Sequence, residues 1–143
     1  MLRILGIDYG SKRVGLALSD PTHLIASPFK TLTVSSDESL ILALQKIIQD
    51  YEIESVVIGM PYRLKGGDSP QTKVVRKFTQ KLMDNGIRVE EEDERLSSVS
   101  AKRALIDQNF KTGKNKGLID QTAAAIMLQQ YLERSEERRV GKE

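Results

Sequence analysis

Apolar residues in this chain form short continuous runs separated by polar turns, a pattern typical of buried β-strands. The first two runs cover residues 3–9 and 13–20. Because so short a connection joins neighbouring strands in antiparallel order, we expect these two runs to form a hairpin. Three further strands are expected at residues 27–34, 54–61 and 87–94.

Elsewhere the apolar residues recur three and four positions apart, as they do on the buried face of a helix. Ser35 with Glu38 is expected to form a capping box at the start of the first helix. Ser69 followed by Pro70 is expected to begin the second. The four expected helices lie near residues 36–48, 70–84, 98–105 and 118–132.

The order of these elements is β-β-β-α-β-α-β-α-α. A meander followed by βαβ units predicts an α/β fold, with a five-stranded mixed sheet and helices on both of its faces. The chain has 143 residues, the length of one domain, which we expect to cover residues 1–133. Residues 134–143 show no apolar face and are expected to form a disordered tail.

The amino-acid composition excludes several kinds of chemistry. The chain has no cysteine and one histidine, so disulfides and thiolate metal sites are excluded. No stretch approaches the roughly 18 apolar residues that a membrane-spanning helix needs, so we expect a soluble protein with no membrane partner. A cytoplasmic location fits this composition.

Charge is distributed unevenly, although the net charge is only +2. Residues 61–88 and 101–117 are rich in lysine and arginine, whereas residues 90–94 between them are all acidic. An acidic cluster flanked by basic segments suits a site that holds metal ions and binds a polyanion. Solvation is the alternative explanation, because charge runs usually coat exposed faces.

Three acids, Asp8, Glu94 and Asp120, stand apart from the surface carboxylates. Asp8 shares strand parity with Ile4, so it lies on a buried face, where a carboxylate needs a partner or a cation. Glu94 ends the fifth predicted strand, beside Asp93.

Asp120 begins the last predicted helix and shares an inward-facing stripe with Ala123, Ala124 and Met127. We therefore expect its side chain to point toward strand ends rather than toward water. The alternative is an ordinary acid at a helix N-terminus, stabilised by the helix dipole. That alternative explains the position of Asp120 along the helix but not its face.

Convergent carboxylates in a chain without cysteine indicate hard-cation chemistry. Oxygen ligands of this kind suit Mg²⁺ or Mn²⁺ rather than zinc. Two such ions, roughly 4 Å apart, can activate a water and stabilise the leaving oxygen in phosphodiester hydrolysis. The predicted catalytic residues and metal ligands of such a two-metal nuclease are Asp8, Glu94 and Asp120.

Four segments together resemble one protein family: GIDYGSKRVGLALSD, VVIGMP, EEDERLSS and KGLIDQTAAAIMLQQYL. They occur in the order found in the YqgF/RuvX family of Holliday-junction-resolvase-like proteins, and the resemblance extends from residue 1 to about residue 133. It implies an RNase H-like fold and a cytoplasmic, metal-dependent nuclease. It also implies a structured nucleic acid as substrate, with the 5′ end of the 16S ribosomal RNA precursor favoured over a DNA junction.

The resemblance also assigns the three acids as the functional carboxylates, with Asp93 as an additional neighbour. Related resolvases carry an acid on the fourth strand, where this chain has Ile58-Gly59-Met60, so Glu94 is expected to fill that role. They carry a further acid one turn after the helix aspartate, where this chain has Ala123 and Ala124.

Several cationic residues in turns and loops are candidates for binding nucleic acid: Lys12, Arg13, Arg63, Lys65, Arg95 and Lys114. For the first two, ordinary solvation of a turn is the alternative. Arg95 is expected to orient Glu94 or to contact the scissile phosphate, with an ion pair to Glu91 or Glu92 as the alternative.

Lys116 lies four residues before Asp120 and is an additional candidate, for stabilising charge in the transition state. A solvated lysine is the alternative.

Three other functions stay open at this point. A Holliday-junction resolvase acting on DNA would use the same carboxylates. A non-catalytic RNA-binding assembly factor could have kept the fold. A nucleotide-binding domain of the actin/sugar-kinase type also has a strand–Asp–Gly hairpin near phosphates, although such proteins need two domains. The chain is expected to be a monomer or a weak homodimer.

Overall fold

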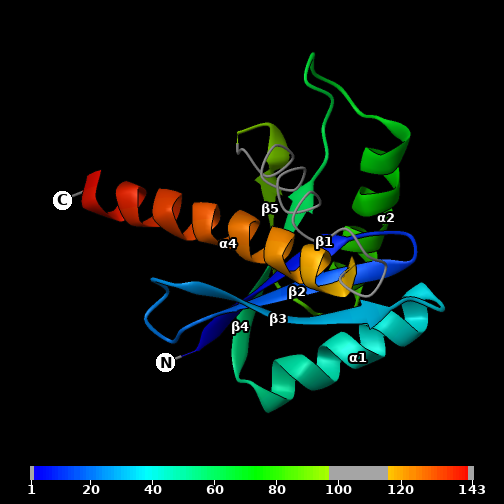
Figure 1. The fold of residues 1–143 in the computed structure, drawn as a ribbon, viewed down its shortest axis with the longest axis horizontal. Coiled ribbons are helices and arrows are strands. Elements are labelled where there is room, and N and C mark those ends of the chain that lie inside the picture. Colours follow the sequence, from blue (N-terminus) through cyan, green and yellow to red (C-terminus); the bar gives the residue numbers. More distant parts are fainter. Residues whose placement is uncertain (1, 97–115, 142–143) are drawn as a thin grey trace.

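The computed structural model describes residues 2–96 and 116–141, and its centre is a five-stranded sheet (Figure 1). The strands lie in the order β3-β2-β1-β4-β5. The hairpin β1–β2 and the pair β2–β3 are antiparallel, whereas β4 and β5 run parallel to β1. The predicted mixed sheet is therefore confirmed. The strand bounds are β1 (Arg3–Tyr9), β2 (Arg13–Ser19), β3 (Ala26–Thr33), β4 (Ile53–Met60) and β5 (Val89–Asp93).

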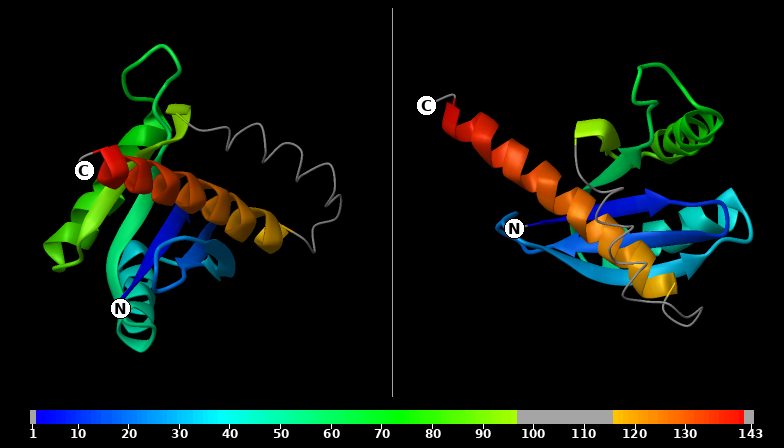
Figure 2. Two further views of the ribbon diagram at one scale, coloured as in Figure 1. Left: turned by 90° about the vertical axis from the view of Figure 1, so that its left-hand side faces the viewer. Right: turned by 45° about the horizontal axis from the view of Figure 1, so that its top comes forward.

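Helices cover both faces of this sheet, as predicted (Figure 2). Helices α1 (Asp37–Asp50) and α2 (Pro70–Asp84) pack on one face and enclose the larger hydrophobic core, whose centre includes Ile7 and Phe78. Helix α4 (Lys116–Gly141) crosses the opposite face and buries a smaller core of alanine, methionine and leucine side chains. None of the described helices combines the length and the apolar character needed to cross a bilayer.

The predicted capping residue is confirmed for helix α2 and is wrong by one position for helix α1. Ser69 caps α2 as predicted, and its partner in the capping box is Thr72. For α1 the cap is Ser36 rather than Ser35, because Ser36 is extended and its hydroxyl accepts the Ser39 N–H. The helix expected after Ser97 or Ser98 lies outside the described residues.

Helix α4 is longer than its sequence pattern predicts. It continues to Gly141, whereas the pattern predicted an end near residue 132. Two polar contacts join its second half to β5: Arg134 forms an ion pair with the buried Glu92, and the Tyr131 hydroxyl donates to Glu90. These contacts connect α4 to the edge strand beyond the apolar stripe of its first half.

At its other end α4 lies directly against the backbone of β2. A Cβ built on Gly15 would lie 2.1 Å from the Asp120 carbonyl oxygen and 2.9 Å from the Gln121 nitrogen. Only glycine leaves room for this approach, because backbone atoms cannot move aside as a flexible side chain can. Gly15 therefore fixes how closely α4 lies above the sheet at Asp120 and Gln121.

We predict that Gly15→Ala strongly destabilises the protein, by about 2–4 kcal/mol, because the added methyl forces α4 away from β2. Urea unfolding followed by circular dichroism measures the change. Gly117→Ala is the matched control on α4, since its Cβ would meet its nearest neighbour at 3.7 Å, an ordinary contact. Equal midpoints for Gly15→Ala and the wild type would show that the helix is not held at this distance.

A second prediction concerns the other end of α4. Arg134→Met keeps the apolar stem but leaves the buried Glu92 carboxylate without its cation, so we expect a loss of about 1–3 kcal/mol in unfolding free energy. Adding Glu92→Gln to that variant should recover part of the loss. Lys46→Met removes an exposed pair with Asp50 and should change stability by less than about 0.5 kcal/mol. An unchanged midpoint in Arg134→Met contradicts the prediction.

Candidate active site

Asp8 on β1 lies between a glycine of β2 and a glycine of β4, and the three residues stand side by side across the middle of the sheet. It pairs with Gly15 on β2. On its other side, the register Ile7↔Ile58 places Asp8 beside Gly59 on β4. The side chain of Asp8 points to the α4 face, because Ile4, which has the same parity, packs in the core under α4. The sequence prediction of a carboxylate on a buried face is thus confirmed.

The other two predicted acids, Asp120 and Glu94, lie over these glycines on the α4 face of the sheet. The Asp120 backbone rests on Gly15, and a Cβ built on Gly59 would lie 2.7 Å from Glu94 Oε1. Glu94 follows β5 as the first residue of the short helix η1 (Glu94–Leu96), and its carboxylate reaches across to β4. Asp8 is therefore flanked by Glu94 on the β4 side and by the start of α4 on the β2 side.

The position of Glu94 bears on the acid that the resemblance expects on the fourth strand. Gly59 has no side chain, and the Glu94 carboxylate occupies the space in which a side chain at that position would begin. This geometry supports the expectation that Glu94 stands in for the fourth-strand acid. Ala123 and Ala124, one turn after Asp120 on α4, are fully buried against the sheet, so no carboxylate stands at those two positions.

Asp120 is paired with Arg13. Its Oδ2 accepts a hydrogen bond from Arg13 Nε at 2.7 Å, and its side chain is only 6% exposed. Arg13 lies on β2 two residues before Gly15, so both residues share the α4 face. The sequence suggested a phosphate contact or plain solvation for Arg13, and the structure adds an ion pair with Asp120.

The donor set fits a hard divalent cation, because all three candidate ligands are carboxylates on one face of the sheet. Among residues 2–96 and 116–141, however, no three acidic or histidine side chains are gathered closely enough to hold an ion. The chemistry of the three acids fits Mg²⁺ or Mn²⁺, whereas their side chains do not converge on one point in this structure.

Asp93, the last residue of β5, forms a separate ion pair with Arg95 in η1. Arg95 Nη2 lies 2.7 Å from Asp93 Oδ2, and the guanidinium lies over the Tyr62 ring at 5.2 Å. The Arg95 hydrogen bonds lower the pKa of Asp93. The alternative for Arg95, an ion pair with Glu91 or Glu92, is not the one found, because Arg95 pairs with Asp93 while Tyr62 donates to Glu91 and Arg134 pairs with Glu92. The expected role of Arg95 toward Glu94 or a phosphate stays a prediction.

The predicted cationic residues border the end of the sheet at which Asp8 lies. Because β1 and β4 are parallel, the turn with Lys12 and the loop with Arg63 and Lys65 leave the sheet at the same end. All three of these residues belong to exposed or partly exposed segments. Lys114 lies outside the described residues, and Lys116 is described only as the first residue of α4.

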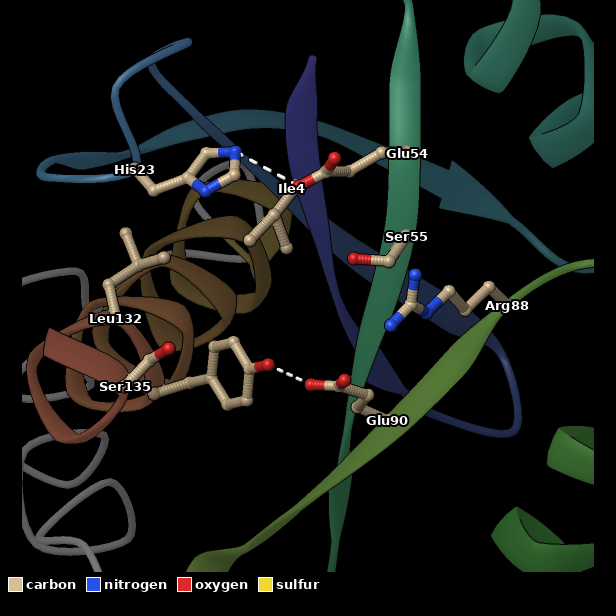
Figure 3. Close-up of a pocket in the computed structure, with 9 residues that line it drawn as sticks. Ile4, His23, Glu54, Ser55, Arg88, Glu90, Leu132 and Ser135 are labelled. Carbon is tan, nitrogen blue, oxygen red and sulfur yellow. Dashed lines mark hydrogen bonds and ion pairs between the residues drawn. The ribbon is translucent and has the colours of Figure 1, made fainter. Parts of the chain in front are cut away.

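A separate pocket of about 240 Å³ lies at the opposite end of the sheet, beneath the second half of α4 (Figure 3). Arg88, Ser55 and Glu90 line it from the sheet side. His23, which the sequence predicts to be a loop residue, also lines the pocket, and its backbone has a positive φ of 61°. Its Nε2 lies 3.2 Å from Glu54 Oε1. No sequence motif marks this pocket, because its residues come from five separate segments.

Two residues of the candidate site, Gly15 and Gly59, were not singled out from the sequence as site residues. Each is a glycine within a predicted strand, a position that often marks the close approach of another chain segment. That signal was present in both strands, but it does not say which segment approaches.

Comparison with known proteins gives a consistent result. A sequence model of the RuvX family, described as Holliday junction resolvase, matches residues 2–134. A protein of Ruminiclostridium cellulolyticum named "Putative pre-16S rRNA nuclease" is 39% identical over 93% of this chain and 95% of its own length. A protein of the same name from Trichormus variabilis is 41% identical over 90% of this chain and 86% of its own.

Solved structures show the same fold at low sequence identity. Thermus thermophilus RuvC in complex with a Holliday junction superposes with a TM-score of 0.61 at 12% identity, over 95% of this chain and 96% of that one. The fowlpox virus resolvase bound to junction DNA gives 0.51 at 14% identity, over 93% and 98%. These structures establish the RNase H-like fold, and the sequence matches over nearly the whole chain establish that it belongs to the RuvX family.

Proposed function

We propose that this protein is a metal-dependent nuclease that hydrolyses phosphodiester bonds in structured RNA, at the 5′ end of the 16S ribosomal RNA precursor. The observation that carries the proposal is the position of Asp8, between Glu94 and the Asp120 segment of α4 on one buried face. The names of the relatives at 39% and 41% identity support RNA as the substrate. Such a role belongs in the cytoplasm.

In this proposal Asp8, Glu94 and Asp120 hold the ions, Mg²⁺ or Mn²⁺. When bound, the ions lower the pKa of a water and neutralise charge on the leaving oxygen. Asp8 is the best-fixed of the three ligands, because it projects from the central strand of the sheet. Glu94 carries its carboxylate over Gly59, and α4 presents Asp120 from the other side.

Substrate binding falls to the cations at the same end of the sheet. Lys12, Arg63 and Lys65 lie in the two segments that leave β1 and β4 beside Asp8. Lysine and arginine side chains at such an edge bind backbone phosphates without reading base sequence. Structured RNA would then be recognised by its shape and placed with a phosphate near Asp8.

A non-catalytic RNA-binding role is the second candidate, and one observation favours it. Asp120 already has a cationic partner in Arg13, and no three acids among the described residues form a closed group for an ion. Both candidates predict salt-dependent RNA binding. They differ in whether Asp8 is needed for turnover or only for local structure.

We predict that Asp8→Asn lowers Mg²⁺-dependent cleavage of a 5′-extended 16S precursor fragment by about 100-fold or more, because the central ligand loses its charge. Binding of the same RNA in EDTA should stay within about threefold of the wild type, since the phosphate-binding cations are intact. Asp50→Asn, at the far end of α1, is the control and should cleave normally. Equal cleavage by Asp8→Asn and wild type, with or without metal, would refute the catalytic assignment.

We also predict that Gly59→Ala separates activity from stability. The new methyl would meet the far end of the flexible Glu94 side chain, which can swing aside, so stability should change by less than about 1 kcal/mol. Displacing the carboxylate should still cut cleavage by about tenfold or more. The double variant with Glu94→Gln should be no less active than Glu94→Gln alone, because both changes act on one group. Full activity in Gly59→Ala would remove Glu94 from the site.

A further inference from the structure

The contact between Arg13 and Asp120 joins two residues that are 107 positions apart in the chain. It links the start of β2 to the start of α4 at the edge of the candidate site. The distance of 2.7 Å between Arg13 Nε and Asp120 Oδ2 is that of a short, charge-assisted hydrogen bond. This contact therefore determines the environment of one of the three proposed metal ligands.

The two partners differ in their freedom to move. The Asp120 side chain is 6% exposed, and its backbone is fixed against Gly15. The Arg13 side chain is 39% exposed, and its long stem lets the guanidinium swing toward solvent. A buried carboxylate is costly without a partner, whereas an exposed guanidinium is solvated by water. Arg13 is thus the partner that can be exchanged.

A divalent cation at Asp120 would compete with Arg13 for the same carboxylate. Two positive groups cannot both approach one oxygen closely without repulsion. With Arg13 in place, no three acids among the described residues are gathered for an ion. The structure thus shows the Arg13–Asp120 ion pair together with carboxylates that, among the described residues, do not gather around one point.

A guanidinium that leaves Asp120 would need a new anionic partner, and the substrate provides one. Arg13 adjoins Lys12 in the turn beside Asp8, at the end of the sheet proposed to hold the RNA backbone. Arginine binds a phosphate through paired N–H donors, which makes the exchange from carboxylate to phosphate favourable.

We propose that Arg13 is a placeholder cation: it neutralises Asp120 in the free protein and moves to a substrate phosphate when a metal ion takes its place. This inference rests on the proposed nuclease function. Its consequence is positive coupling, in which nucleic acid strengthens metal binding and metal strengthens nucleic-acid binding by the same factor. The free protein would hold metal weakly, and the site would assemble only on substrate.

Calorimetric titration of Mn²⁺ into the full-length protein tests this, with and without a short RNA hairpin whose phosphorothioate backbone resists cleavage. For the wild type we expect the hairpin to strengthen Mn²⁺ binding by about tenfold or more, the scale of one charge-assisted hydrogen bond. Arg13→Gln should bind Mn²⁺ about tenfold more tightly than the wild type without RNA, because its competitor is gone. The same variant should lose most of the coupling.

Lys12→Gln is the matched control, since it removes one positive charge from the same turn. Its Mn²⁺ affinity without RNA should stay within about twofold of the wild type, because a solvent-exposed charge is screened. Equal Mn²⁺ affinities for the wild type and Arg13→Gln, with the same response to RNA, would overturn the placeholder role and leave the nuclease proposal intact. Absence of Mn²⁺ binding in both proteins and both states would overturn both proposals.

Discussion

The close approach of α4 to the sheet at Gly15 is the constraint on which the candidate site depends. The Asp120 carbonyl rests where a side chain of β2 would otherwise stand, so helix and strand meet backbone to backbone. This contact sets the height of α4 above the sheet at Asp120. Asp120 is buried as a consequence, and a buried carboxylate requires a cation nearby. Both Arg13 and the proposed metal follow from that requirement.

The acidic residues 90–94, four of which lie in β5, have different partners because their side chains point to different faces of the sheet. Alternate side chains of a strand point to opposite faces, so Glu90 and Glu92 share the α4 side. Tyr131 and Arg134 bind these two, which holds the second half of α4 against β5. That leaves Glu94 as the acid of this series that lies over β4.

The remaining two acids of the run face the other way. Glu91 accepts from the Tyr62 hydroxyl, and Asp93 pairs with Arg95. A run that looks like one metal-binding cluster in the sequence is therefore divided between two faces. Only the residue at its end contributes to the candidate site, and the Asp93 side chain is engaged by its own neighbour.

Features that depend on local periodicity were predictable from the sequence. The five strands, the buried face of Asp8 and the inward stripe of Asp120 all follow from spacing within one segment, and the structure confirms them. The pairing of Arg13 with Asp120 was not predictable, because it depends on how two distant elements are placed. The length of α4 was missed for the same reason, since its second half is held by partners on β5.

The pairing of Gly59 with Glu94 explains how this chain can lack an acid on β4 and still present a carboxylate there. Gly59 offers open space above the strand, and glutamate has the extra methylene needed to reach that space from the end of β5. Neither residue would suffice alone: a side chain at position 59 would block the carboxylate, and a shorter acid at position 94 would not extend as far. The candidate carboxylate is thus defined by where its oxygen lies, and a strand-by-strand comparison of residue types would overlook it.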